Sequence, residues 1–170
     1  MTDQLVVGGD GLIGKALYRR LQVTGQRVKY TTRDQSRKSP DSVLLDLAAA
    51  AEIEVAPKVA YLCAGISDLD ACERDPRGTR KINVDAIVAL AEKLYARGTH
   101  LVFLSSQIVF DGRDPVQAED APPTAVIAYG RQKIEAERRI LGLGDRSAVV
   151  RMSKIISRKV PIVGRWLESP

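Results

Sequence analysis

Tyr129 and Lys133 stand four residues apart in a segment with helical spacing, so their side chains share one helix face. An ammonium group beside a phenol favours the phenolate and lowers a phenol pKa that is ordinarily about 10. Such a tyrosine can exchange a proton with a carbonyl or alcohol oxygen near neutral pH. Ser105 and Ser106 end an apolar run, and a serine hydroxyl can hold the reacting oxygen by a hydrogen bond. Together these residues predict proton transfer at a carbonyl, whereas the tyrosine and lysine taken alone could be a chance helical pair.

Three glycines form a second chemical signal near the start of the chain. Gly8, Gly11 and Gly14 are spaced three apart between an apolar run and a helical pattern. A turn without side chains lets backbone N–H groups approach a pyrophosphate at a helix N-terminus. The spacing therefore predicts a dinucleotide-binding turn, and the alternative is a tight turn with a closely packed helix.

The end of the second apolar run indicates which dinucleotide binds. An acid at the position of Thr32 would bind the ribose hydroxyls of NAD, but threonine stands there and Arg33 follows it. An arginine suits a 2′-phosphate because its planar fork makes paired charge-assisted hydrogen bonds. We therefore expect NADP as the cofactor, with NAD as the alternative. Arg37 and Lys38 could add to the positive field, or could belong to a solvated basic loop.

The segments that would position these residues alternate between short apolar strands and helices. This alternation predicts an α/β fold with a doubly wound parallel sheet, the Rossmann fold, in which ligands bind at the carboxyl ends of the strands. The glycines and the two serines both follow strands and should meet at that edge. The prolines in 111–126 predict a long loop. The expected strands are 4–7, 27–32, 43–45, 58–63, 100–105 and 147–152, and the expected helices are 12–23, 84–96 and 129–141.

Composition limits the remaining classes of protein. A chain of 170 residues with 45% apolar residues is suited to one globular domain. The net charge of +5 and the pI of about 9.4 fit an anionic ligand, while an aromatic content of 5% provides no stacking surface for bases, so we expect no nucleic acid partner. No run approaches the roughly 20 apolar residues of a membrane span. We therefore expect a cytoplasmic protein without a membrane partner.

Over residues 5–152 the sequence resembles the extended short-chain dehydrogenase/reductase family, also called the NAD-dependent epimerase/dehydratase superfamily. Segments 67–73 and 106–112, the latter reading Ser-Gln-Ile-Val-Phe-Asp-Gly, look most like its dTDP-4-dehydrorhamnose reductase branch. The resemblance is carried by the glycine turn, Asp46-Leu47, Cys63-Ala64-Gly65, Asn83-Val84, Ser105-Ser106, and Tyr129 with Lys133.

The resemblance implies a role for each matched residue. Ser106 would polarise the substrate carbonyl, Tyr129 would protonate its oxygen, and Lys133 would assist Tyr129 and bind the nicotinamide ribose. Tyr129 would also contact the cofactor. The further cofactor-binding residues would be Gly8, Gly11, Leu12, Ile13 and Gly14 at the pyrophosphate, Thr32 and Arg33 at the adenosine ribose, Asp46 and Leu47 at the adenine, and Ala64 and Gly65 along the cofactor.

Two further groups of polar residues have competing interpretations. Asn83 could belong to a proton relay or could simply begin a helix. Asp68, Asp70 and Glu73 are interpreted as a solvated acidic patch at a helix start, and we expect no metal site there or elsewhere in the chain.

Two departures from the family pattern limit the interpretation. Dehydratases of the family carry an acid pair where this chain has Gln107 and Ile108, which disfavours dehydration. Family members also continue for roughly another hundred residues that build the substrate lobe. We expect a dinucleotide-binding domain over 1–152, and in 153–170 only the start of a truncated or minimal substrate-binding segment, with a short helix near 163–168 that includes Trp166. We therefore expect the C-terminal substrate lobe to be largely absent, whether the chain is a fragment or naturally short.

Three functions remain open at the level of sequence. The first is a NAD(P)-dependent reductase of a small-molecule carbonyl, with a nucleotide-linked keto-sugar as the expected substrate. The second is a nucleotide-sugar epimerase, which retains NAD and which Arg33 disfavours. The third is a regulatory or redox-sensing subunit that binds NADP without turnover. A homodimer is a candidate assembly for any of the three.

Overall fold

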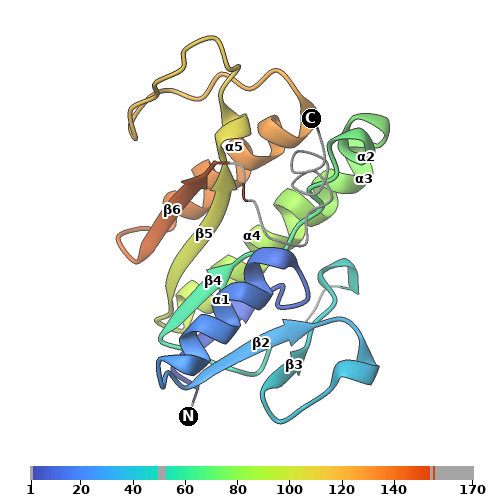
Figure 1. The fold of residues 1–170 in the computed structure, drawn as a ribbon, viewed down its shortest axis with the longest axis vertical. Coiled ribbons are helices and arrows are strands. Elements are labelled where there is room, and N and C mark those ends of the chain that lie inside the picture. The colour runs from blue at the N-terminus through green and yellow to red at the C-terminus, as the bar shows by residue number, and fades with distance from the viewer. Residues whose placement is uncertain (1, 50–52, 154, 156–170) are drawn as a thin grey trace, which may run out of the picture.

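Six parallel strands form one sheet in the order β3-β2-β1-β4-β5-β6 (Figure 1). The structure is a computed structural model that describes residues 2–49, 53–153 and 155. The strand order reverses between β1 and β4, and this is the place where doubly wound sheets bind ligands at their carboxyl edge. The predicted fold class is therefore confirmed. The strands are β1 (Gln4–Val7), β2 (Val28–Thr32), β3 (Ser42–Leu44), β4 (Val59–Leu62), β5 (His100–Ser106) and β6 (Ser147–Met152).

The central strand β1 is buried on both faces, which explains its unbroken apolar sequence. It pairs with β2 on one side and with β4 on the other, so that Leu5 lies opposite Lys29 and Ala60. Leu5, Val6 and Val7 have no exposed surface. Leu5 and Val7 pack into the main core, which is completed by side chains from β4, β5 and the helices behind the sheet.

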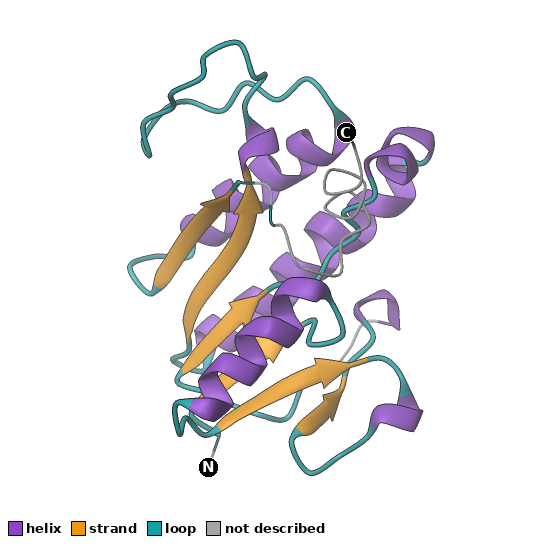
Figure 2. Cartoon of the chain, viewed as in Figure 1, coloured by secondary structure: helices purple, strands orange, loops and turns teal. Residues whose placement is uncertain are grey.

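Helices cover the two faces of the sheet unequally. α1 (Leu12–Val23) lies in front of the sheet in Figure 2, while α4 (Ile87–Ala96) and α5 (Ala128–Leu141) lie behind it. The fully buried core joins strand residues Leu62 and Phe103 to Leu94 of α4 and Ile140 of α5. α1 ends at Val23 with Thr24 as its C-cap, and Gly25 follows with a φ of +75°, as expected for a helix stop.

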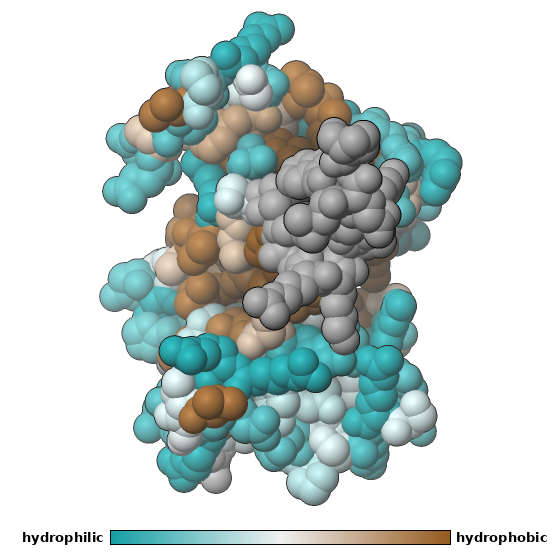
Figure 3. Space-filling model, viewed as in Figure 1, coloured by the Kyte–Doolittle hydropathy of each residue, from teal (hydrophilic) through white to brown (hydrophobic). Residues whose placement is uncertain are grey.

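The front face of β5 and β6 is open among the described residues. No described helix covers it, and apolar side chains gather there in Figure 3. Val150 of β6 is 45% exposed, and Leu12 at the start of α1 is 52% exposed. The helical spacing in 12–23 predicted α1 correctly. Leu12 belongs to the apolar pattern of this helix, but its side chain is not buried.

The predicted helix over 84–96 is the last part of a much longer helical region. α2 (Leu69–Arg74), α3 (Pro76–Arg80) and the π-helical segment η3 (Lys81–Ala86) precede α4 without a loop. Asp68 begins α2 by accepting a hydrogen bond from the N–H of Ala71, and Asp75 begins α3 by accepting one from the N–H of Gly78.

The remaining expectations concern the loop 111–126, membrane-spanning helices and the C-terminal segment. The prolines of 111–126 do form a long loop without helix or strand, and three short 3₁₀ turns occur elsewhere. These are η1 (Gln35–Arg37), η2 (Leu47–Ala49) and η4 (Gln107–Val109). Within the described ranges, none of the helices has the length and apolar character needed to cross a membrane. The expected helix at 163–168 with Trp166, and most of the segment 153–170, lie outside the described residues.

Candidate functional site

The glycine turn between β1 and α1 is held close to two neighbouring strands. Gly8 has a φ of +90°, and a side chain there would bring a Cβ within 2.8 Å of the backbone of Ala64. Its N–H donates to Thr31 Oγ1 over 2.8 Å. A Cβ on Gly14 would collide with the carbonyl oxygen of Gly8, which explains a glycine at this helix position. The helix N-cap is Gly11, which offers no side-chain cap and leaves the first N–H groups of α1 free for an anion.

A cavity of about 390 Å³ opens over this turn at the reversal point of the sheet. Many of the predicted cofactor residues line it, while Thr32 is not among them and is only 2% exposed. Leu12, Ile13 and Gly14 are not among the lining residues. The cavity therefore fits a dinucleotide cradle in which Gly14 acts by packing. The lining residues are Val7, Gly8, Asp10, Gly11, Thr31, Arg33, Leu45, Asp46, Leu47, Ala48, Cys63, Ala64, Gly65, Ile66 and Ile82.

The polar groups at the end of β2 are arranged differently from the expectation. Thr32 Oγ1 donates to Asp10 Oδ2 over 2.7 Å, so a carboxylate from the glycine turn stands beside this strand end. Arg37 pairs with Asp10 over 3.0 Å and with Asp34 over 3.3 Å. The guanidinium of Arg37, for which both a part in the positive field and a place in a solvated loop were considered, is thus shared between two carboxylates. Arg33 lines the cavity and makes no ion pair with a described residue.

Tyr129 and Lys133 lie in the first turns of α5 and are both buried, with 9% and 6% of their surfaces exposed. Lys133 Nζ donates to the carbonyl oxygen of Leu104 over 2.9 Å. The ammonium lies 4.4 Å from the centre of the Phe103 ring and 5.8 Å from the centre of the Tyr129 ring. The helix thus brings the pair together on one face, as the spacing predicted.

Burial decides the proton affinities of these groups. It lowers the pKa of Lys133 to about 8, against the opposing charges of Cys63 and Glu137. Burial also raises the pKa of Tyr129 above its ordinary value, and the charge of Cys72 adds to that rise. The expectation that Lys133 lowers the phenol pKa is therefore wrong, because desolvation is the largest cause and raises this pKa.

A cysteine connects the lysine to the cavity. Cys63 lines the cavity after β4, and burial raises the pKa of its thiol to about 12 although Lys133 acts in the opposite direction. The pKa of Cys63 and the pKa of Lys133 thus influence each other. Sequence reasoning assigned no role to Cys63 beyond its place in the family motif.

Ser106 lies at the carboxyl end of β5, next to the start of α5. Its Oγ accepts a hydrogen bond from the N–H of Ile108 over 3.3 Å. The turn η4 that follows packs so closely on α5 that a Cβ on Gly130 would collide with the carbonyl oxygen of Ile108. The turn that follows Ser106 and the start of the helix that carries Tyr129 are therefore in contact, and the joint role of the two side chains stays a prediction.

A buried amide clip joins the cavity wall to α5. Asn83 Oδ1 accepts from the N–H of Ile66 over 2.7 Å, and Nδ2 donates to the carbonyl oxygen of Ile66 over 2.9 Å. Nδ2 also donates to Gln132 Oε1 over 2.7 Å, and Gln132 Nε2 donates to Thr79 Oγ1. The polar atoms of Asn83 thus hold the loop after β4 in place, and the proton-relay role stays a prediction.

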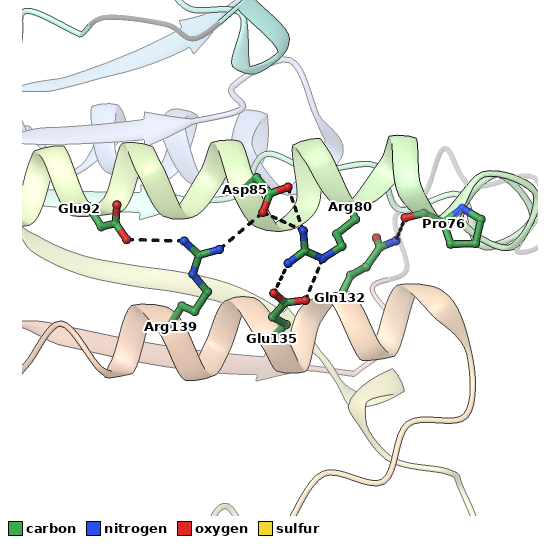
Figure 4. A network of polar contacts seen from close by, with 7 residues as sticks. All are labelled: Pro76, Arg80, Asp85, Glu92, Gln132, Glu135 and Arg139. Atoms are coloured by element: carbon green, nitrogen blue, oxygen red, sulfur yellow. Dashed lines mark hydrogen bonds and ion pairs between the residues drawn. The ribbon is translucent and has the colours of Figure 1, made fainter.

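Charged residues hold α5 against the helices beside it (Figure 4). Arg80 binds both Asp85 and Glu135, and Arg139 reaches Asp85 over 3.5 Å and Glu92 over 3.7 Å. At the start of α5, Glu73 accepts a hydrogen bond from the N–H of Ala128. The helix dipole favours a negative charge at this end of a helix. The acidic patch expected around Glu73 thus includes a residue that anchors the helix of Tyr129.

Comparison with known proteins places this arrangement in a family. A family model described as the RmlD substrate binding domain matches residues 2–161. The chain belongs to this family. The resemblance to extended short-chain dehydrogenases/reductases and their dTDP-4-dehydrorhamnose reductase branch is thereby confirmed.

Three individual proteins illustrate the similarity. Methionine adenosyltransferase 2 subunit beta of Bos taurus is 32% identical over 151 residues, which are 87% of this chain and 45% of that protein. A dTDP-4-dehydrorhamnose reductase of Sinorhizobium fredii is 29% identical over 152 residues, which are 82% of this chain and 51% of that protein. A solved dTDP-4-dehydrorhamnose reductase of Bacillus anthracis in complex with NADP has a TM-score of 0.77 at 23% identity, covering 90% of this chain and 54% of the other.

The chain spans about half the length of the curated relatives that it matches. The family model matches residues 2–161 and thus covers the sheet, the glycine turn and the Tyr129–Lys133 pair of the present structure. Activity, substrate and partners of the relatives are properties of longer proteins, and for this chain they are matters of proposal.

Proposed function

We propose that this chain is the cofactor-binding and catalytic part of a NAD(P)-dependent reductase. The proposed substrate is a carbonyl compound, and the family favours a nucleotide-linked keto-sugar. The observation that carries the proposal is the cavity built on the glycine turn, together with the buried pair Tyr129 and Lys133 on one face of α5. A reduced nicotinamide dinucleotide, when bound, supplies the hydride for the carbonyl carbon.

The chain's own residues account for the remaining steps. The N-terminus of α1 and the glycine turn would hold the pyrophosphate, and Asp46 and Ala64 would line the adenosine and central parts of the cavity. Ser106 would donate a hydrogen bond to the carbonyl oxygen of the substrate. As this oxygen gains negative charge, Tyr129 would give it the phenol proton. A raised pKa keeps that proton on Tyr129 at neutral pH, which suits a proton donor.

Lys133 would contact both the cofactor and Tyr129. Its ammonium has one acceptor among the described residues, the carbonyl oxygen of Leu104, and an ammonium has three hydrogens to donate. The two others could hold the nicotinamide ribose and stabilise the charge left on Tyr129. The lowered pKa of about 8 leaves most of the lysine protonated at pH 7.

The test is the oxidation of NADPH by the native protein with dTDP-4-dehydrorhamnose, comparing the parent with Tyr129→Phe. Cofactor affinity should barely change, while turnover should fall by roughly 10²–10⁴, the usual contribution of a positioned acid. Tyr95→Phe is the matched control, because Tyr95 lies on α4 with its hydroxyl near Asp145. Unchanged turnover in Tyr129→Phe would show that the assignment is wrong.

A second function is supported by a separate observation, the identity of 32% with a protein named as a subunit of methionine adenosyltransferase 2. In that case the chain would bind NADP and a partner protein without turnover. The two proposals differ in outcome: a regulatory subunit would bind NADPH, yet the parent and Tyr129→Phe would both fail to oxidise it with any keto-sugar.

A further inference from the structure

The carboxylate of Asp10 occupies a position that the linear sequence does not reveal. Asp10 belongs to the glycine turn, but its Oδ2 lies 2.7 Å from the hydroxyl of Thr32, the last residue of β2. Thr32 is 2% exposed, whereas Asp10 lines the cavity together with Thr31 and Arg33. An acid from one loop therefore stands at the end of another strand, on the side that faces the ligand space.

In dinucleotide-binding folds, residues at the end of this strand determine whether NAD or NADP binds. An acid there accepts hydrogen bonds from the ribose hydroxyls of NAD, and an arginine nearby accommodates the 2′-phosphate of NADP. In this chain the strand itself supplies Thr32, but the carboxylate of Asp10 is only one hydrogen bond away from it. Arg33 lines the same cavity. The site thus holds one group suited to each form of the cofactor.

Of the two acids that pair with Arg37, Asp10 is better placed than Asp34 to contact a bound cofactor. Asp34 also pairs with Arg37, over 3.3 Å, but its other oxygen accepts from the N–H and the hydroxyl of Ser36, and it does not line the cavity. Arg37 is held by Asp10 as well, over 3.0 Å. A 2′-phosphate would therefore meet a carboxylate at Asp10 and a guanidinium at Arg37 that already has two partners.

We propose that Asp10 is a specificity-determining residue of the cofactor site. It accepts a hydrogen bond from the adenosine 2′-hydroxyl of NADH and repels the 2′-phosphate of NADPH, while Arg33 attracts that phosphate. The site consequently takes both forms, and the balance between Asp10 and Arg33 sets their ratio. This inference rests on the proposed function, because it assumes that the cavity binds a nicotinamide dinucleotide.

The test measures dissociation constants of NADH and NADPH for the parent and for Asp10→Asn. Asparagine keeps the size of the side chain and an oxygen that can accept from Thr32, but it removes the charge. The preference for NADPH over NADH should grow by about ten- to a hundredfold, as expected when a charged hydrogen-bond partner is lost and a repulsion is relieved. ADP-ribose and its 2′-phosphate, tested in the same way, should show the same change and confine it to the adenosine end.

Asp34→Asn is the matched control, because it also takes a carboxylate from Arg37 but leaves Asp10 in the cavity. It should change the preference less than about twofold. An equal shift in Asp34→Asn, or an unchanged preference in Asp10→Asn, would overturn the role of Asp10. Asp10→Ser provides a second way to remove the charge and should shift the preference in the same direction. If the parent binds neither nucleotide, the proposed function itself fails, which is a different result.

Discussion

Arg33 is the residue from which a preference for NADPH is expected. It lines the cavity and forms no ion pair with a described residue, so its guanidinium is available to a 2′-phosphate. Arg33→Ala should weaken NADPH binding by roughly ten- to a hundredfold and leave NADH binding nearly unchanged. Titration of both nucleotides by fluorescence measures this. Lys38→Ala is the control, since Lys38 belongs to the same basic segment but does not line the cavity. Equal losses for NADPH and NADH would contradict the assignment.

The buried ammonium of Lys133 should make stability depend on pH. Its pKa in the folded protein is about 8, compared with an ordinary value of 10.5. Between these values the folded chain has lost a proton that the unfolded chain still binds, so the free energy of unfolding rises with pH. The difference between the parent and Lys133→Met should therefore shift by about 2–3 kcal/mol in favour of the parent from pH 7 to pH 10. Urea unfolding at several pH values measures it, and a constant difference would show that Lys133 titrates normally.

At the scale of residues, the sequence predicted which side chains share one helix, but it did not predict contacts between different elements. The spacing of Tyr129 and Lys133 correctly placed them on one helix face, because four residues are about one turn. The pKa of Tyr129 was predicted in the wrong direction, since burial cannot be read from two residues alone. Asp10 was missed as a neighbour of Thr32 because the two are 22 positions apart and only the paired strands bring them together.

At the scale of elements, the amide clip of Asn83 should matter more than the charged network beside it. Asn83→Ala would leave the N–H and carbonyl of Ile66 and the oxygen of Gln132 without these partners in a buried place. The expected loss in the free energy of unfolding is about 2–4 kcal/mol. Arg139→Ala removes ion pairs that are more than a third exposed and should cost less than about 1 kcal/mol. Chemical denaturation compares the two, and equal losses would mean that the clip is not a major constraint.

The elements themselves could be predicted where apolar patterns are long. All six strands and three helices were expected within a few residues of their observed bounds, because a buried parallel sheet needs continuous apolar runs. Of the two short helices, α2 was expected only as a helix start near Asp68 and α3 was not expected, since helices of six and five residues have too few turns for a periodic pattern. Asp68 was interpreted as part of an acidic patch at a helix start, which the N-cap of α2 agrees with, whereas Asp75 received no interpretation.

At the scale of the whole molecule, Arg151 connects three parts of the chain. From β6 it binds Glu137 of α5 over 2.9 Å, and it donates to the carbonyl oxygens of Glu119 and Ala121 in the loop 111–126. The side chain of Glu137 is only 4% exposed. Arg151→Ala would leave this carboxylate buried without its partner, which should cost about 3–5 kcal/mol.

Two measurements test this connection. Thermal or urea unfolding should show the loss for Arg151→Ala, and the double variant with Glu137→Ala should lose less than the two single variants together. Hydrogen exchange should also rise in the loop 111–126, because two of its carbonyl groups lose a donor. Arg138→Ala on the exposed side of α5 is the control. Unchanged exchange in the loop would show that Arg151 does not hold it.

The burial of the Cys63 and Cys72 thiols has a practical consequence for labelling experiments. With a pKa of about 12, roughly one Cys63 side chain in 10⁵ is a thiolate at pH 7, and Cys72 has no exposed surface. A maleimide dye should therefore react slowly with the folded protein and quickly once unfolding exposes both cysteines. Val116 in the loop 111–126 is 79% exposed, so Val116→Cys should take up a fluorophore selectively without removal of the native cysteines. Movement of the loop could then be followed optically, and the slow reaction at Cys63 would report each opening of the fold.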